Sequence, residues 1–245
     1  MLLISDLHLE DSRPEITASL LYFLQSNEGA CDALYILGDL FDVWIGDDDV
    51  SELAISVAAA LKAFNDAGAS IYIMHGNRDF LIGADFAQRC GAALLADPYV
   101  LQSAAGPILL LHGDQLCTDD TDYMQFRDMV RQESWQQEFL RKSLKDRSAF
   151  AQQAREQSRL ATASKPESIM DVNQAEVQRL LADTGQLTMI HGHTHRPAIH
   201  DVALTGPING QTMAKRIVLG DWHQMVWFGE ISSDGVKLQH LPLQT

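Results

Sequence analysis

The feature that most constrains the fold of this chain is a short apolar run that ends in a polar cluster and recurs along the sequence. Each run has about four or five apolar residues, β-branched or aromatic in part, followed by Gly, Asp, Asn or His. The runs are MLLISDLH (1–8), ALYILGD (33–39), SIYIMHGNRD (70–79), PILLLHGD (107–114) and LTMIHGHTH (187–195). Runs of this kind are typical of buried β-strands.

Helical patterns lie between these predicted strands. Residues 14–27 carry apolar side chains at helical spacing, and residues 51–68 begin at a Ser cap and end at a Gly. Strands that alternate with helices predict an α/β fold. Near the C-terminus, the segments RIVLGDW, MVWFGEIS and VKLQHLPL predict successive strands joined by short turns, and therefore a more antiparallel sheet.

Residues 120–168 interrupt this pattern because they lack strand signals and are predicted to be helical. They hold nine of the chain's 18 Lys and Arg residues and eight acidic residues, so this segment is nearly neutral while the remainder is strongly acidic. We predict a core of residues 1–119 and 169–245 that carries residues 120–168 as a helical insertion, or lid. A solvated helical hairpin with one packing face is the open alternative.

Charge and cysteine content narrow the class of protein. The net charge of −15 disfavours a protein that binds nucleic acid by neutralising phosphates, so no nucleic-acid partner is expected. Three cysteines without CxxC spacing indicate a reducing compartment. The N-terminus lacks the pattern of a signal peptide, and no apolar stretch is long enough to span a bilayer. We therefore expect a cytoplasmic protein, with contact to a membrane surface still open.

Residues that can bind a metal ion follow the predicted strands. In open α/β sheets, ligands bind beyond the carboxyl ends of the strands, and side chains two residues apart in an extended segment point to one face. The candidates are Asp6, His8, Asp39, Asn77, His112, His193 and His195. These donors suit Mn²⁺, Fe²⁺ or Zn²⁺. Seven are too many for one catalytic ion, so we predict two ions bridged by Asp39. Paired ions about 3.5–4 Å apart support in-line displacement at phosphorus.

Each motif taken alone has an ordinary structural explanation. Gly38-Asp39 is a common turn sequence, and Asn77 tolerates a left-handed turn. The acidic run at 47–49 is expected to be a loop outside the site. The remaining histidines are expected to be structural or to support the site: His75, His191, His200, His223 and His240.

In their order along the chain, the motifs DLH, GDLFD, GNRD, HGD and GHTH resemble those of the calcineurin-like metallophosphoesterase superfamily, over residues 6–195. The resemblance implies a sandwich of two β-sheets flanked by helices. It also implies two Mn²⁺ ions per chain. One would be held by Asp6, His8, Asp39 and His195, and the other by Asp39, Asn77, His112 and His193.

Position 78 departs from the superfamily pattern. Most members have GNH[DE], whose His can protonate a leaving alkoxide, whereas this chain has Arg78. Arginine is not an acid at ordinary pH but binds phosphate in a fork. A phosphate monoester leaves without protonation more easily than an alkoxide, so Arg78 favours pyrophosphate cleavage. The alternative is an ion pair between Arg78 and Asp79.

Longer strings narrow the resemblance to the UDP-2,3-diacylglucosamine diphosphatase family: YILGDLFDVWIGDDD, HGNRDFLIG, HGDQLCTDD, SIMDVNQ and HGHTHRPAIH. The resemblance implies hydrolysis of UDP-2,3-diacylglucosamine to UMP and 2,3-diacylglucosamine 1-phosphate, by attack of water on the α-phosphorus, in lipid A synthesis. It also implies a peripheral location on an anionic surface, the cytoplasmic face of the bacterial inner membrane. The competing expectations are a phosphoesterase for soluble nucleotide-type substrates and a scaffold without catalysis.

The resemblance also assigns site residues. Catalytic roles fall to Asp39, Asn77, Arg78 and His193, and substrate contacts to Asn77, Arg78, Asp120, Ser158, Thr162, Lys165 and His193. Many relatives have Asn where this chain has Thr162, which puts that contact in doubt. The apolar side chains expected to line a chamber for acyl chains are Phe126, Met129, Val130, Trp135, Phe139 and Leu140. The basic residues of the insertion are expected to favour anionic lipid headgroups.

Overall fold

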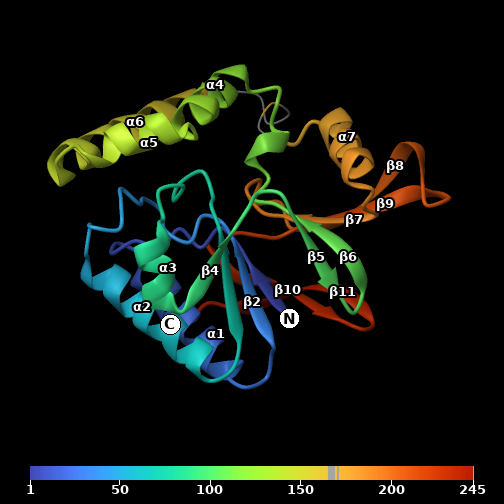
Figure 1. The fold of residues 1–245 in the computed structure, drawn as a ribbon, viewed down its shortest axis with the longest axis horizontal. Helices are drawn as coiled ribbons and strands as arrows, with labels where there is room; N and C mark the ends of the chain where they lie inside the picture. The colour runs from blue at the N-terminus through green and yellow to red at the C-terminus, as the bar shows by residue number, and fades with distance from the viewer. Residues whose placement is uncertain (165–168, 170, 245) are drawn as a thin grey trace.

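The computed structural model describes residues 1–164, 169 and 171–244. Two mixed β-sheets lie face to face with helices on their outer faces, which confirms the predicted α/β sandwich (Figure 1). The first sheet contains β1 (Leu2–Ile4), β2 (Ala33–Leu37), β3 (Ser70–Met74), β4 (Ala92–Leu95), β10 (Met225–Ser232) and β11 (Gly235–Pro242). The second contains β5 (Tyr99–Ser103), β6 (Gly106–Leu110), β7 (Thr188–His191), β8 (Ala198–Ile208) and β9 (Gln211–Val218).

The strand order is β11-β10-β1-β2-β3-β4 in the first sheet and β5-β6-β7-β9-β8 in the second. Neighbours β1 to β4 are parallel, as are β6, β7 and β9. The carboxyl ends of parallel neighbours meet at one edge of a sheet. The polar clusters that follow β1, β2 and β3 are therefore brought to one rim, and those that follow β6 and β7 are brought together likewise.

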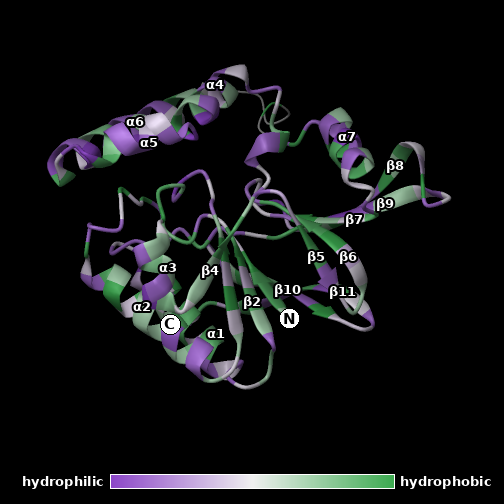
Figure 2. Cartoon of the chain, viewed as in Figure 1, coloured by the Kyte–Doolittle hydropathy of each residue, from purple (hydrophilic) through white to green (hydrophobic). Residues whose placement is uncertain are grey.

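Period-two alternation along the strands divides the apolar residues among three layers. In β2, Leu34 and Ile36 pack in the layer that includes residues of α1 (Pro14–Ser26), α2 (Glu52–Asp66) and α3 (Ala84–Cys90), while Tyr35 and Leu37 face the second sheet. A third layer joins the second sheet to α7 (Gln174–Thr184). Figure 2 shows the apolar colour concentrated on the strands. The alternation thus produces four packed layers, helix–sheet–sheet–helix.

The predicted helices at 14–27 and 51–68 correspond to α1 and α2, and the Ser51 hydroxyl caps α2 by accepting from the backbone N–H of Ala54. The strands β4, β5 and β8 were not predicted. They are partly exposed, so their residues do not form the continuous apolar runs that mark the buried strands.

Three helices lie over the strand ends: α4 (Thr121–Val130), α5 (Glu133–Leu140) and α6 (Leu144–Ser164) (Figure 1). They account for the helical character predicted for residues 120–168, as far as the structure describes that segment. A short 3₁₀ turn, η1 (Asp114–Leu116), precedes them. None of the helices in the described ranges has both the length and the apolarity needed to cross a membrane.

Candidate metal centre

The backbone of the strand-end loops is unusual at the predicted ligands. Five of the seven have a positive φ: Asp6 (57°), His8 (50°), Asp39 (53°), His193 (65°) and His195 (55°). Among the described non-glycine residues, only Asn209 shares this conformation. Such a conformation costs on the order of 1–3 kcal/mol per residue and persists where the surroundings impose it, commonly at functional sites. The loops are therefore held in a strained form that aims these side chains inward.

Glycines in the motifs allow the ligand loops to approach one another. A Cβ atom on Gly76 would overlap the Asp39 carboxylate, and one on Gly192 would overlap the Asp6 carboxylate and the Ser5 hydroxyl. The first residue of GNRD and of GHTH is therefore glycine because any side chain there would overlap a neighbouring carboxylate. It lets the next loop pass against a buried carboxylate.

One group of ligand atoms gathers around Asp6. His195 Nε2 lies 3.4 Å from Asp6 Oδ1, and His8 Nε2 lies 3.2 Å from His195 Nε2. His8 Nε2 is also 3.8 Å from Asp39 Oδ2. These side chains come from segments up to 187 residues apart, since His8 and His195 have that separation. Asp6, His8 and His195 can converge on one cation.

A second group gathers around Asn77. The Asn77 Oδ1 atom lies 2.9 Å from His112 Nε2 and 2.9 Å from His193 Nδ1. The other oxygen of Asp39, Oδ1, lies 3.8 Å from His112 Nε2. Asp39 therefore stands between the two groups, one oxygen towards each. The structure brings all seven predicted ligands together.

Electrostatics favour cations at this position. Burial, together with the charges of Asp79 and Asp6, raises the pKa of Asp39 to about 7 against the opposing effect of His112. Burial lowers the pKa of His8 to about 3 and that of His193 to about 4, so both imidazoles are neutral at pH 7 and retain a lone pair for a metal. Against the effect of burial, the charges of Asp39 and Asp6 raise the pKa of His112 to about 9, and Asp6 raises the pKa of His195. The buried carboxylates therefore favour positive charge at this position, which a divalent cation supplies.

Buried polar atoms without hydrogen-bond partners also indicate that this position suits a cation. Asp6 Oδ1 and His8 Nδ1 are buried and have no hydrogen-bond partner among the described residues. An orphaned buried carboxylate oxygen costs free energy unless a cation or donor reaches it. The residues present therefore fit a pair of divalent ions, with Asp39 placed to serve both.

Two acidic residues that the sequence did not single out stand behind the ligands. Asp221 Oδ2 lies 3.4 Å from His195 Nδ1, and Asp42 Oδ1 lies 3.8 Å from His8 Nδ1. A carboxylate behind a ligating His orients the ring and raises its basicity. The sequence did contain a pattern that could have identified Asp221, because GDW follows an apolar run in the same way as GDLFD. Asp42 was obscured by the acidic run that follows it.

Asp79, the last residue of GNRD, connects two ligand loops. Its carboxylate accepts from the backbone N–H groups of Asp39 (3.2 Å), Leu40 (2.7 Å) and Gly76 (2.8 Å). The alternative ion pair between Arg78 and Asp79 is not formed. The Arg78 side chain has no hydrogen bond or ion pair to any residue that the structure describes, so its guanidinium remains available to a ligand.

A cavity of about 530 Å³ opens between the metal centre and the helices above it. Asn77, Arg78, His193 and His195 line it on the core side, and aromatic side chains of the insertion complete it. Of the apolar residues expected there, Phe126, Trp135 and Phe139 line the cavity. Val130 is instead buried elsewhere, and Met129 and Leu140 are each 40% exposed, because helical periodicity turns them to other faces.

The expected substrate contacts divide into two sets. Asp120 and Ser158 line this cavity. Asp120 also caps α4 by accepting from the backbone N–H of Tyr123 at 3.1 Å. The Thr162 side chain and Lys165 lie outside the described part of the chain.

Several arginines of the insertion face the core rather than the solvent. Arg127 Nε donates to Asp114 at 2.8 Å and Arg131 Nη2 donates to the Gly76 carbonyl at 2.9 Å, while Arg147 pairs with Asp48 and Arg155 with Asp42. The loop at 47–49 is therefore only partly solvated, since Asp48 holds Arg147. Four of the basic residues expected to face lipid instead attach α4 and α6 to the core. Arg141, Lys142 and Lys145 remain exposed.

The fold and the site define a phosphoesterase. The family model described as calcineurin-like phosphoesterase matches residues 1–197, and the chain belongs to that family. It is a metal-dependent hydrolase, in a family whose members use two metal ions.

Curated relatives are similar over nearly the full length. The UDP-2,3-diacylglucosamine hydrolase of Cellvibrio japonicus (strain Ueda107) is 50% identical over 239 residues, 98% of each chain. That of Marinobacter nauticus is 50% identical over 243 residues, 99% of this chain and 98% of the relative. That of Xanthomonas oryzae pv. oryzae (strain PXO99A) is 47% identical over 249 residues, 99% of each. The family resemblance inferred from the motifs is confirmed.

Proposed function

We propose that this chain hydrolyses the pyrophosphate bond of UDP-2,3-diacylglucosamine, releasing UMP and 2,3-diacylglucosamine 1-phosphate, in lipid A biosynthesis. The observation that carries the proposal is the position of the aromatic-lined cavity, which shares Asn77, Arg78 and His193 with the metal centre. A phosphoesterase for small soluble substrates has no need of this apolar space. The names of the relatives point to the same substrate.

Asp6, His8, Asp39 and His195 would hold one Mn²⁺, and Asp39, Asn77, His112 and His193 the other. When bound, the ions supply an activated water and neutralise charge on the phosphoryl oxygens. Asp39 fixes the spacing of the two groups, because its oxygens face His8 and His112. Asn77 and His193 line the part of the cavity next to the metal centre, where the phosphoryl groups would bind.

Arg78 orients the pyrophosphate. Its free guanidinium stands at the cavity wall and can donate two parallel hydrogen bonds to phosphoryl oxygens. It offers no proton to a leaving group at ordinary pH, so the site favours a leaving group that needs none. A sugar 1-phosphate is such a group. Water attacks the α-phosphorus, and the P–O bond to the sugar phosphate breaks.

The helices α4 to α6 act as the lid of a lipid site in this proposal. Phe126, Trp135 and Phe139 give the acyl chains an apolar surface, and Asp120 and Ser158 contact the polar part of the substrate. Thr162 and Lys165 belong to the same proposed contact set. A scaffold without catalysis is disfavoured because all seven ligand side chains are present and converge.

The test is turnover of UDP-2,3-diacylglucosamine by the purified protein with Mn²⁺, beside UDP-N-acetylglucosamine. We expect rapid hydrolysis of the acylated compound only, and loss of activity in EDTA. Trp135→Ala should raise KM for the acylated substrate. Equal turnover of both compounds would favour a phosphoesterase for soluble nucleotide-type substrates, and full activity in EDTA would exclude the proposed centre.

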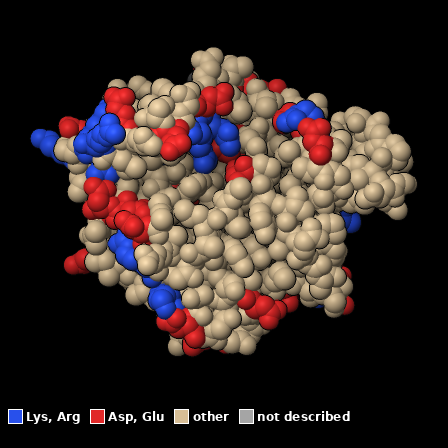
Figure 3. Space-filling model, in the orientation of Figure 1, with Lys and Arg blue, Asp and Glu red and all other residues tan. Residues whose placement is uncertain are grey.

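We also propose that the protein works at the cytoplasmic face of the inner membrane as a peripheral protein. Arg141, Lys142 and Lys145 are exposed beside Leu140 and Leu144, each 40% exposed, at the junction of α5 and α6. Figure 3 shows Lys and Arg side chains gathered at the α5–α6 end of the molecule. Replacing Arg141 and Lys142 with Glu should weaken binding to vesicles that contain anionic lipid, whereas Lys62→Glu on α2 should not. Unchanged binding by the first variant would refute this part.

A further inference from the structure

The helix α6 separates two cavities that meet at Arg78. The first is the aromatic-lined cavity already described. The second, of about 810 Å³, lies on the other side of α6, against the loop that follows β2. Both volumes fall within the roughly 300–1,000 Å³ typical of small-molecule sites. Arg78, Asp42 and Ser158 line both cavities, so the two cavities are adjacent and share a wall.

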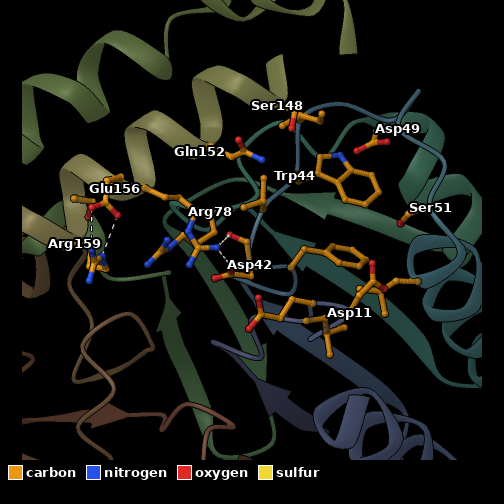
Figure 4. Close-up of a pocket in the computed structure, with 18 residues that line it drawn as sticks. Asp11, Asp42, Trp44, Asp49, Ser51, Arg78, Ser148, Gln152, Glu156 and Arg159 are labelled. Carbon is orange, nitrogen blue, oxygen red and sulfur yellow. Dashed lines mark hydrogen bonds and ion pairs between the residues drawn. The ribbon is translucent and has the colours of Figure 1, made fainter. Parts of the chain in front are cut away.

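The two sides of α6 differ in chemistry. Of the α6 residues that line the first cavity, four are small or apolar and three are polar: Phe150, Ala151, Ala154 and Ala161, beside Arg155, Gln157 and Ser158. Polar side chains of α6 line the second, among them Ser148, Gln152 and Glu156, and the Glu156 carboxylate pairs with Arg159 (Figure 4). These three recur every four residues and so share one helix face. The insertion therefore presents a wall rich in aromatic and small apolar side chains to the first cavity, whereas the α6 side chains that line the second cavity are all polar.

The opposite wall of the second cavity is also polar. Asp11, Asp49 and Ser51 line it there, beside apolar side chains that include the buried rings of Phe41 and Trp44. An acyl chain placed among so many charged and polar groups would desolvate them without replacing their hydrogen bonds, which is costly. This cavity suits a polar ligand with some flat apolar surface.

We propose that the second cavity binds the uridine half of the substrate, an inference that rests on the proposed function. UDP-2,3-diacylglucosamine has an apolar half and a nucleoside half on either side of its pyrophosphate, and the site has an apolar and a polar cavity on either side of Arg78. The cleaved bond then lies at the metal centre, and each half occupies the cavity whose chemistry matches it.

Gln152 is the residue best matched to uracil. Its side-chain amide makes no hydrogen bond to any described residue, and it carries one acceptor and one donor group side by side. Uracil offers the complementary pair, an N3–H donor beside a carbonyl oxygen. The carboxylates of Asp11 and Asp49 are of the type that accepts hydrogen bonds from ribose hydroxyls.

The test compares Gln152→Leu with Gln153→Leu. Gln153 is the adjacent residue of the same type and is exposed, as Gln152 is, but it lines neither cavity. Inhibition constants are measured for UMP, inorganic phosphate and 2,3-diacylglucosamine 1-phosphate, each with Mn²⁺-loaded protein. The ratio of the constants for UMP and phosphate isolates the nucleoside contribution from the phosphate contribution.

Gln152→Leu should raise the inhibition constant of UMP by roughly five- to tenfold, which corresponds to the loss of one or two neutral hydrogen bonds. Phosphate and the lipid product should be unaffected, and Gln153→Leu should match the wild type for all three probes. Equal UMP affinity in both variants, or a loss confined to the lipid product, would overturn the inference. If the wild type does not hydrolyse UDP-2,3-diacylglucosamine, the proposed function fails, and calorimetry with UMP on the same variants still decides whether the cavity binds the nucleotide.

Discussion

Removal of the Asp221 carboxylate should lower the affinity for one metal ion and leave the affinity for the other unchanged. Asp221 Oδ2 lies 3.4 Å from the Nδ1 atom of His195, whose Nε2 atom faces Asp6. In Asp221→Ala the imidazole loses the group that orients it and raises its basicity. Loss of such a partner typically costs about 10–100-fold in metal affinity.

The structure places the expected loss at the lower end of that range. The 3.4 Å separation is long for a charged hydrogen bond, and the side chains of Asp221 and His195 are 31% and 37% exposed, so water screens the interaction. We expect about a tenfold loss, close to 1.4 kcal/mol. The second ion should keep its affinity, because Asn77, His112 and His193 have no contact with Asp221.

The assay is calorimetric titration of metal-free protein with Mn²⁺, fitted to two sites. Asp201→Asn, on β8, is the matched control, since its side chain is 70% exposed and pairs only with Lys215 among the described residues. Activity of Asp221→Ala should return towards the wild-type value at saturating Mn²⁺. Equal weakening of both ions, or unchanged affinity for both, would refute the assignment of Asp221 to the ion held by His195.

Three further changes test how the site is supported. Gly192→Ala should abolish Mn²⁺ binding at the Asp6 group, because the new Cβ overlaps the Asp6 carboxylate. The same overlap should lower the free energy of unfolding by roughly 1–3 kcal/mol. Tight Mn²⁺ binding by this variant would contradict the prediction. Arg147→Met leaves the Ile45 carbonyl without its donor and should cost about 1–3 kcal/mol in urea unfolding. Arg159→Met, at a side chain 74% exposed, should leave the urea midpoint nearly unchanged, and equal shifts in the two variants would show that Arg147 is no anchor. Burial, with Asp114 nearby, raises the pKa of Asp97 to about 6, so its ionisation in the folded state opposes folding as pH rises from about 4 to 6. Asp97→Asn should therefore be more stable than the wild type at pH 8, by at most about 3 kcal/mol, and equally stable below pH 4; a pH-independent difference would count against this account.

Local pattern was sufficient to predict the α/β class and most of the buried strands, whereas the sandwich of two sheets was implied by the family resemblance. Buried strands read as apolar runs and α2 carries its cap at Ser51, so both could be recognised without tertiary information. The site could be predicted in part for a related reason. Parallel neighbours bring the polar residues after β1, β2 and β3 to the rim of one sheet and those after β6 and β7 to the rim of the other. Only the packing of the two sheets brings both sets into one site.

The exposed strands and the insertion were less predictable. β8 alternates exposed and half-buried positions and lacks an apolar run, so nothing marked it as a strand. Helical spacing in α4 and α5 identified apolar residues but not which face meets the cavity. Phe139 lines the cavity while its neighbour Leu140 is 40% exposed, and the orientation of the helices decides between them.

The sequence by itself determined the α/β class, the strand-end donors and the helical character of the insertion, because each depends on residues a few positions apart. Only the tertiary structure decided that Asp221 stands behind His195, that Asp48 holds Arg147, and that α6 has a cavity on each side. These features depend on how distant segments pack against one another. No local pattern of side chains carries that information, because the same helix or loop would look alike in sequence whichever partner it faced.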